Sequence, residues 1–253
     1  PVFTLDSLPG IHQVDLGSTR METTIPFHTR MIEAALYVAN HPELELVQIV
    51  SFGCGHDAVL SDEITRVLRS QSGKEPLVLK LDEGEAKGPL HIRITSFIET
   101  VKERRKRKVN IPLFLPGKKC RPFETRFLSP HKKEKIILTP NLSYSFSKIA
   151  TSILQREGYK TVQMPLADEK AIELGKKYVH NDICFPAQIN IGEALSVLQS
   201  GTFSPSQVAL ALAKNCEDCR AGQYAMLARK ALDDAGYPEV PIITTGRDTK
   251  KMH

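Results

Sequence analysis

The amino-acid sequence predicts an α/β protein made of two open parallel-sheet halves joined by a basic, proline-rich linker. Three observations lead to this prediction. Short β-branched runs alternate with helix-period segments before residue 105, the alternation resumes after residue 135, and the residues between follow neither period. Strands that alternate with helices imply parallel βαβ units, because a parallel connection needs a long crossover segment.

The first half contains five segments of this pattern, each marked by helical apolar spacing or by a short β-branched run. The predicted elements are a helix at 29–40, a strand at 46–52, a helix at 57–72, a strand at 76–81 and a helix at 90–105. Gly73 follows the third segment directly, where the left-handed C-terminal residue of a helix is expected.

The second half repeats the pattern. Predicted strands lie at 135–139, 161–164, 208–213 and 240–244, and predicted helices at 143–157, 168–178, 183–199 and 223–235. The helix at 143–157 carries one apolar stripe, formed by Phe146, Ile149, Ala150, Ile153 and Leu154. We therefore expect two Rossmann-like domains, at 1–105 and 135–253, with a linker at 106–134.

Composition narrows the class of protein. Hydrophobic residues make up 41% and charged residues 25%, which is typical of a folded globular chain. No apolar run is long enough to cross a membrane, and the first ten residues lack the pattern of a signal peptide. Because the chain begins at Pro1 without a methionine, we expect a fragment of a longer polypeptide. Five cysteines, an odd number, indicate a reducing compartment, and we expect a cytoplasmic protein.

The net charge of +5 is unevenly distributed. Between Lys102 and Lys135 there are 13 basic and 3 acidic residues, so the rest of the chain, at +5 less +10, carries −5. The basic segment has three open interpretations: a solvated helix end beside a linker, a docking surface for a phosphate-bearing ligand or an acidic partner, or a nucleic-acid site. The third is the least favoured, since the chain has no Trp and no recognised nucleic-acid module.

Three cysteines lie at predicted junctions between elements. Cys54 follows a strand and lies in a Gly-Cys-Gly turn before a helix. Cys184 precedes Phe185-Pro186 at the start of the helix at 183–199, and Cys219 follows the strand at 208–213 just before a helix. In open α/β sheets, ligands bind beyond the carboxyl ends of the strands. Helix N-terminal amides also favour a thiolate, the form that ligates metals or attacks as a nucleophile.

Other interpretations of the cysteines remain open. Each could be a buried apolar side chain, since free cysteine is among the most buried residue types. Cys216 and Cys219 form a CxxC pair. A thioredoxin-type disulfide needs this pair on the first helix after an early strand, whereas here it lies late in the chain. A zinc site would need a second close pair of ligands, and the sequence has none. Cys120, in the linker, is expected to be an incidental thiol. No glycine-rich phosphate loop is present, which argues against a nucleotide site within these residues.

Polar residues beside the cysteines have their own expected roles. Asp57 is expected to be the N-cap of the helix that follows Cys54, and Asp182 a candidate cap near Cys184. His180 could donate to a bound anion or simply end a helix.

Three strings of the sequence resemble the large fusion proteins of the 2-hydroxyacyl-CoA dehydratase activator family. They are 20–30 (RMETTIPFHTR), 48–57 (QIVSFGCGHD) and 178–188 (YVHNDICFPAQ). Those proteins join an ATP-hydrolysing activase to a region similar to the dehydratase subunits and the double-cubane cluster proteins. The resemblance extends over most of the chain to Ile243.

The resemblance implies an iron–sulfur protein of anaerobic electron transfer. In the dehydratase-like proteins, cysteines from separate α/β domains hold a cubane cluster in the cleft between the domains. The candidate ligands carried over are Cys54, Cys184 and Cys219, with Cys216 as an alternative at the last position. Three ligands would leave one iron open for substrate or for a bridge to a second cubane, so both a [4Fe-4S] cluster and a double cubane are expected candidates.

Two hypotheses follow. In the first, the chain is the dehydratase-like iron–sulfur portion of an ATP-dependent low-potential electron-transfer system that acts on or for acyl-CoA dehydration. In the second, it is a non-catalytic α/β scaffold or docking domain of the same fusion, without a cluster. The resemblance implies an activase portion or subunit as partner, with its ATP site outside this chain, and makes an acyl-CoA and a second copy of the chain further candidates. Neither a membrane nor nucleic acid is an expected partner.

Overall fold

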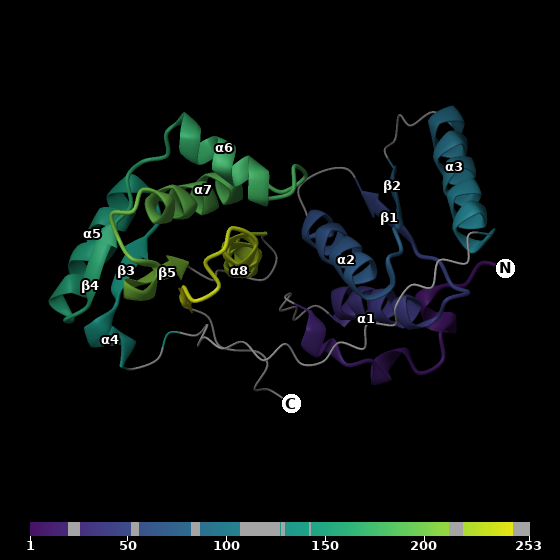
Figure 1. Ribbon diagram of the computed structural model, residues 1–253, viewed down its shortest axis with the longest axis horizontal. Helices are drawn as coiled ribbons and strands as arrows, with labels where there is room; N and C mark the ends of the chain where they lie inside the picture. The colour runs from purple at the N-terminus through teal and green to yellow at the C-terminus, as the bar shows by residue number, and fades with distance from the viewer. Residues whose placement is uncertain are drawn as a thin grey trace. The chain divides into compact units, whose positions relative to one another are not determined.

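The computed structural model describes residues 1–19, 26–51, 56–81, 87–106, 127, 130–141, 143–212 and 220–244 (Figure 1). The chain forms two compact units: the described residues up to 106 belong to unit 1, and those from 127 onward belong to unit 2. Both units combine helices with a parallel sheet, so the predicted α/β class is confirmed. None of the described helices is long and apolar enough to cross a membrane.

Unit 1 has a two-stranded sheet with three helices. Its elements are the short turns η1 (Leu5–Ser7), η2 (Ile11–Gln13) and η3 (Leu16–Ser18), then α1 (Pro26–Asn40), β1 (Val47–Ser51), α2 (Asp57–Ser72), β2 (Leu77–Leu81) and α3 (Lys87–Lys106). The strands are parallel, and Val47 pairs with Leu77 at the start of the ladder. The helix α1 begins at Pro26, three residues earlier than predicted. Proline suits the first turn of a helix, because the N–H that it lacks would have no helical partner there.

The core of unit 1 lies between α1 and α2. Leucine and isoleucine side chains four residues apart on each helix are almost fully buried: Ile32 and Leu36 on α1, and Leu60, Ile64 and Leu68 on α2. As predicted, α2 ends at Gly73, whose φ of 63° is left-handed and whose N–H donates to the carbonyl of Arg69.

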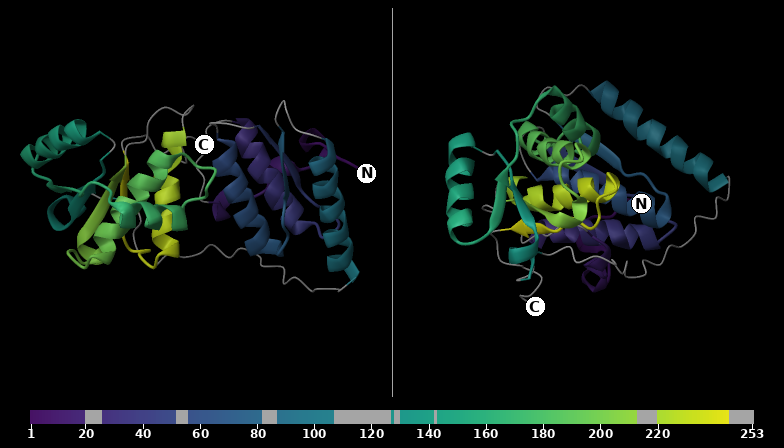
Figure 2. Two further views of the ribbon diagram at one scale, coloured as in Figure 1. Left: turned by 90° about the horizontal axis from the view of Figure 1, so that it is seen from above. Right: turned by 60° about the vertical axis from the view of Figure 1, so that its left-hand side comes forward.

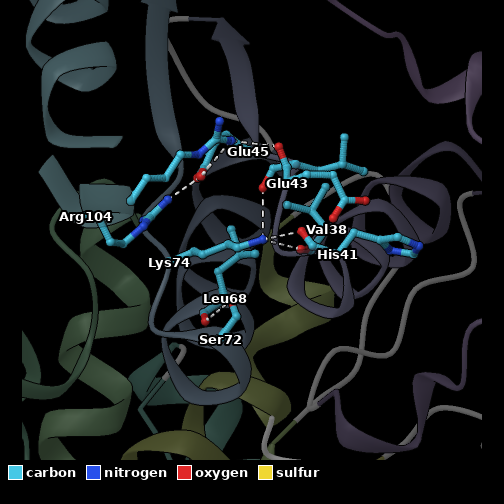
Figure 3. A network of polar contacts seen from close by, with 10 residues as sticks. Val38, His41, Glu43, Glu45, Leu68, Ser72, Lys74 and Arg104 are labelled. Atoms are coloured by element: carbon cyan, nitrogen blue, oxygen red, sulfur yellow. Dashed lines mark hydrogen bonds and ion pairs between the residues drawn. The ribbon is translucent and has the colours of Figure 1, made fainter. Parts of the chain in front are cut away.

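Lys74 connects the end of α2 to the end of α1 (Figure 3). Its buried Nζ donates to the carbonyl oxygens of Val38, His41 and Leu44, at 2.7, 2.6 and 2.9 Å. Burial lowers the pKa of Lys74, and the nearby carboxylate of Glu45 opposes that shift. One ammonium thus joins the Val38 carbonyl in the last turn of α1 to two carbonyls of the loop that leads into β1. The carbonyls of Val38 and His41 also accept the backbone N–H groups of His41 and Leu44.

The basic end of α3 is held against the same loop (Figure 3). Arg104 forms a hydrogen-bonded ion pair with Glu45, and Arg105 donates to the carbonyl of Glu43 at 2.8 Å. Lys102 and Lys106 pair with glutamates three residues before them, as exposed helix-surface ion pairs. Within the described part of the basic segment, these side chains therefore have partners inside unit 1. The remaining predicted linker lies mostly outside the described residues, at 107–126, 128 and 129.

Unit 2 contains a four-stranded parallel sheet in the order β4-β3-β5-β6. Its elements are α4 (His131–Glu134), β3 (Ile136–Thr139), α5 (Tyr144–Arg156), β4 (Lys160–Gln163), α6 (Glu169–Tyr178), α7 (Phe185–Gln199), η4 (Pro205–Gln207), β5 (Val208–Leu212), η5 (Arg220–Gln223), α8 (Tyr224–Asp234) and β6 (Ile242–Thr244). Each predicted strand and helix of the second half is present, with ends shifted by one or two residues.

The strand order reverses direction between β3 and β5. The chain moves outward from β3 to β4, then crosses back to β5 and on to β6. Because parallel crossovers are right-handed, helices of the two directions lie on opposite faces of the sheet. Figure 2 shows α5 on one side of the sheet and α6, α7 and α8 on the other. The crevice beyond the carboxyl ends of β3 and β5 is the position where such sheets bind ligands.

Two glycines set the close packing of α6 on α7. A Cβ at Gly192 of α7 would lie 1.9 Å from the carbonyl oxygen of Ala171, and a Cβ at Gly175 of α6 would lie 1.9 Å from that of Gln188. Either distance is far inside van der Waals contact. The backbones can approach this closely only because both positions lack a side chain, and this contact fixes the position of α7.

The orientation of α5 differs from what its apolar stripe suggests. The side chains that it buries on the sheet are Ser147 and Thr151, whereas Phe146, Ile149 and Ile153 are 65%, 60% and 56% exposed. Hydrogen bonds fix this orientation: Thr151 Oγ1 lies 2.8 Å from Thr139 Oγ1, and Ser147 Oγ donates to the carbonyl of Pro140. Helix and spacing were predicted correctly, but the stripe turns away from the sheet that the helix covers.

Candidate functional site

The N-terminus of α7 is the described position that best matches the predicted cysteine site. Cys184 is its N-cap residue, with extended backbone angles, and Pro186 occupies the first helical turn. The thiol is half-buried, and its Sγ lies 2.8 Å from the hydroxyl oxygen of Tyr224. Tyr224, only 5% exposed, is the first residue of α8. Cys184 is thus a thiol with partial access to solvent and a fixed hydrogen-bonding neighbour.

A tight turn leads into Cys184 and fixes its position. Ile183 donates its N–H to the carbonyl of His180 at 3.0 Å, and the N–H of Asp182 donates to His180 Nδ1 at 3.2 Å. Val179 and Ile183 are buried on either side of the turn. The prediction that Asp182 caps the helix is wrong: the helix begins later, and Cys184 occupies the N-cap position.

The hydrogen bond from the Asp182 N–H indicates which tautomer the His180 ring adopts when it is neutral. Because Nδ1 accepts from Asp182, a neutral His180 carries its proton on Nε2. The imidazole is half-exposed, and its Nδ1 also lies 3.8 Å from the Asp182 carboxylate. The role of His180 as a donor to a bound anion stays a prediction.

A buried carboxyl group on α7 holds the loops at the carboxyl edge of the sheet. Glu193 Oε2 accepts from the backbone N–H of Asn141 at 3.1 Å, and Oε1 accepts from the N–H of Ala167 at 3.2 Å and from Asn141 Nδ2 at 3.3 Å. Asn141 follows β3 and Ala167 follows β4. Burial raises the pKa of Glu193, against the lowering effect of these hydrogen bonds.

Glu193 is therefore a positioning residue. It lies nine residues beyond Cys184, about 13 Å along the helix, so the two groups do not act on one atom. Its carboxyl group instead attaches α7 to the loops that follow β3 and β4. This attachment sets the height of the α7 N-terminus above the sheet edge.

In unit 1, two histidines lie near the carboxyl end of β1. His56 is the N-cap residue of α2, and its ring centroid lies 5.1 Å from that of His28 on α1. Burial lowers the pKa of His28, the neighbouring His56 adds to this, and Asp57 opposes it. His28 Nδ1 is buried and has no hydrogen-bond partner among the described residues.

The prediction for Asp57 is wrong by one position. The helix α2 begins at Asp57 itself, and His56 precedes it as N-cap without a side-chain capping bond. Asp57 still lies in the first turn, where its negative charge suits the positive end of the helix dipole. The sequence alone does not separate adjacent candidates for the first turn, since both are polar.

Three of the four candidate cluster ligands lie outside the described residues. Cys54 falls within 52–55, after β1, and Cys216 and Cys219 fall within 213–219, after β5; the linker residue Cys120 is also outside. The structure thus describes Cys184 and the elements that flank the others. Those flanking strands end at the carboxyl edges of the two sheets, and β5 is one of the two strands at the direction reversal in unit 2.

Within the described ranges, no three His, Cys, Asp or Glu side chains are grouped to hold a metal ion. Cys184 places a half-buried sulfur at a helix N-terminus, beside a hydroxyl group.

Sequence reasoning did not identify Tyr224, Glu193 or His28 as site residues. Glu193 had a readable signal, since it is the one charged residue in the helix Phe185–Gln199. A lone charge in an apolar helix must find partners when it is buried. Tyr224 and His28 had no signal of this kind, because their roles depend on neighbours far away in the sequence.

Comparisons of the chain with protein-family models, with curated proteins and with solved structures found no match.

Proposed function

We propose that the chain is the dehydratase-like iron–sulfur portion of an ATP-dependent, low-potential electron-transfer system. In this proposal the two units are Rossmann-like domains joined by a basic linker at 106–134, in a cytoplasmic protein. Cys54, Cys184 and Cys219 are the ligands of a [4Fe-4S] cluster or double cubane, with Cys216 as the alternative to Cys219. The ATP-hydrolysing activase is a partner outside these residues, and an acyl-CoA is the candidate substrate.

The observation that carries the proposal is the environment of Cys184. Its thiol is a half-buried N-cap group on a helix that glycine packing and the Glu193 hydrogen bonds hold in position. A cluster ligand needs a sulfur that reaches the cofactor and a neighbourhood that excludes most water. A cysteine used only as a core side chain would instead be fully buried.

The residues around Cys184 have distinct proposed roles. With Cys184 bound as a thiolate, the Tyr224 hydroxyl 2.8 Å away would donate to the sulfur and stabilise negative charge on the ligand. The Nε2–H of His180 would donate to the negative charge of a bound acyl-CoA or of the cofactor. When bound, the cluster would accept and donate one electron at low potential.

The test is anaerobic reconstitution of the chain with iron and sulfide, followed by iron and sulfide analysis and visible and electron paramagnetic resonance spectroscopy. We expect several irons per chain in the wild type. Cys54→Ser, Cys184→Ser and Cys219→Ser should each lose most of this iron, whereas Cys120→Ser should keep it. A colourless, iron-free protein would overturn the proposal and would favour the alternative, a non-catalytic α/β scaffold.

A further inference from the structure

His28 and His56 of unit 1 form a close pair of imidazole rings that the proposed function does not use. His28 lies in the first turn of α1, and His56 is the N-cap residue of α2. The two ring centroids lie 5.1 Å apart, and the ring planes are tilted by 45°. Because neutral imidazole is the commonest metal ligand in proteins, such a pair is a candidate site for a metal ion.

The packing of α1 on α2 holds both rings in position. Ile32 lies one turn after His28, Leu60 lies one turn after His56, and both apolar side chains are almost fully buried. Leu60 also donates its N–H to the His56 carbonyl at 2.9 Å. The histidines therefore continue the buried face of the helix pair, with His56 only 9% exposed and His28 half-buried. Ligands held by rigid helices need little reorganisation when an ion binds.

The separation of the two rings suits one ion bound by both. A divalent ion lies about 2.0–2.1 Å from a ligating imidazole nitrogen, and so about 3.2 Å from the centroid of that ring. Two rings on one ion, at angles of about 90–120°, therefore have centroids about 4.5–5.5 Å apart. The observed separation of 5.1 Å falls within this range. Rings that stack directly lie closer together, as Tyr37 and His41 do at 4.0 Å with an interplanar angle of 19°.

One nitrogen of the pair lacks the partner that burial demands. His28 Nδ1 is buried and has no hydrogen-bond partner among the described residues. A buried polar atom without a partner costs about 1–3 kcal/mol, and a bound ion is one of the explanations for such an atom. The His56 side chain makes no capping bond to its helix, so this role does not occupy its ring nitrogens.

The charges around the pair are compatible with a bound cation. Burial lowers the pKa of His28, and the neighbouring His56 adds to this effect, so His28 is neutral at neutral pH and keeps a lone pair for a metal. The positive ends of the α1 and α2 dipoles oppose a cation. The carboxylate of Asp57 in the first turn of α2 offsets them, and its negative charge also acts on His28.

We propose that His28 and His56 together bind one divalent transition-metal ion of the kind that prefers imidazole nitrogen, such as Zn²⁺ or Ni²⁺. His28 Nδ1 supplies one ligand atom, and a ring nitrogen of His56 supplies the other. No third His, Cys, Asp or Glu in the described part of the chain is grouped with them, so water fills the other positions. The ion is therefore exchangeable, unlike the fully ligated ion of a structural zinc site. The proposal uses no cysteine and does not depend on the iron–sulfur cluster.

The test is equilibrium dialysis of the full chain, without a cluster, against Ni²⁺ at neutral pH. His28→Ala and His56→Ala should each weaken binding at least about tenfold, because loss of a residue that merely supports a ligand already costs that much. His91→Ala, at an exposed position of α3, is the matched control and should bind like the wild type. Cys54→Ser should also bind like the wild type, which distinguishes this site from the proposed cluster.

A measurement on the wild type covers the case in which a histidine variant fails to fold. In the NMR spectrum of the chain labelled at its histidine ring nitrogens, Zn²⁺ should shift the signals of His28 and His56 and leave those of His91 in place. Three results would overturn the proposal. They are no ion bound by the wild type, wild-type affinity in both histidine variants, and loss of binding in Cys54→Ser, which would assign the ion to the thiol.

Discussion

Cys184 Sγ and Tyr224 Oη lie 2.8 Å apart and connect the first residues of two helices that are 40 positions apart in the sequence. The contact joins the N-termini of α7 and α8 at the carboxyl edge of the unit 2 sheet. It gives the one described candidate ligand a hydroxyl neighbour that is itself almost fully buried. A thiolate has no proton to donate, so Tyr224 is the donor whenever Cys184 is a thiolate.

Replacing Tyr224 with phenylalanine should therefore slow the alkylation of Cys184. Without the hydroxyl, the thiolate loses one hydrogen bond, and we expect the rate of reaction with iodoacetamide at neutral pH to fall about threefold to tenfold. Mass spectrometry of the peptide that contains Cys184 measures this rate separately from the other cysteines. Tyr144→Phe, on the exposed side of α5, is the matched control and should leave the rate unchanged. An unchanged or faster rate in Tyr224→Phe would contradict the assigned donor.

The stability of the protein should depend on pH through Glu193. Burial raises the pKa of this carboxyl group above its ordinary 4.5, so the folded state holds the proton more tightly than the unfolded chain does. The resulting stabilisation is complete below the unfolded value and is lost as the pH rises through the folded pKa. Urea unfolding of the wild type and of Glu193→Gln, from about pH 4 to pH 7.5, measures this component.

Glutamine at position 193 does not titrate. The free energy of unfolding of Glu193→Gln should therefore decline less than that of the wild type as the pH rises from about 4 to 7.5. The amide also loses one acceptor facing the Asn141 N–H, which should lower stability at acidic pH by about 1–2 kcal/mol. Glu173→Gln, at an exposed position of α6, should keep the wild-type slope. Parallel profiles for Glu193→Gln and the wild type would show that Glu193 does not titrate in this way.

Replacing Lys74 with methionine should destabilise unit 1 by about 3 kcal/mol. Methionine matches the length of the aliphatic stem but removes the Lys74 ammonium from the carbonyls of Val38, His41 and Leu44, of which the first two keep a backbone N–H donor. The midpoint of chemical denaturation, followed by circular dichroism, measures the loss. Lys170→Met on the exposed side of α6 should change stability by less than about 0.5 kcal/mol. Equal effects of the two substitutions would mean that the three carbonyl contacts contribute little.

A methyl group at position 192 should disrupt the packing of α7 on α6. Gly192→Ala would place its Cβ 1.9 Å from the carbonyl of Ala171, so the helices must separate, at a cost of about 3 kcal/mol. Gly88→Ala is the matched control, since a Cβ there meets nothing within 4 Å and alanine favours the helix. The midpoint temperature of thermal unfolding should therefore fall in Gly192→Ala and stay unchanged or rise in Gly88→Ala. A neutral Gly192→Ala would show that α6 and α7 separate without loss.

Local sequence signals predicted the elements of this protein well. The strand at 46–52 is present as β1, the helix at 57–72 is present as α2, and Gly73 ends it in a left-handed conformation. These features depend on residues within one or two turns of each other: apolar spacing, β-branched runs and a glycine. Local signals were less reliable at the first helical turns: Asp57 was expected at the N-cap position that His56 occupies, and the candidate cap Asp182 lies two residues before the N-cap residue Cys184.

The candidate site could be predicted only in part. The position of Cys184 at the start of a helix followed from Pro186 and the apolar spacing after it. Its neighbour Tyr224 and the loop contacts of Glu193 could not be predicted, because they join segments 40 and 52 residues apart. Long-range hydrogen bonds depend on which strands become neighbours, and that order is not encoded within any single segment.

The sequence by itself determined that this is an α/β protein, where most of its helices and strands lie, and which cysteine begins the helix after residue 183. Only the tertiary structure decided the direction in which each helix turns its side chains. The sequence placed an apolar stripe on α5, but the paired hydroxyls of Thr139 and Thr151 turn Ser147 and Thr151 toward the sheet and leave Phe146, Ile149 and Ile153 exposed. Periodicity shows which residues share a face, whereas the rotation of that face depends on hydrogen bonds and contacts with distant segments.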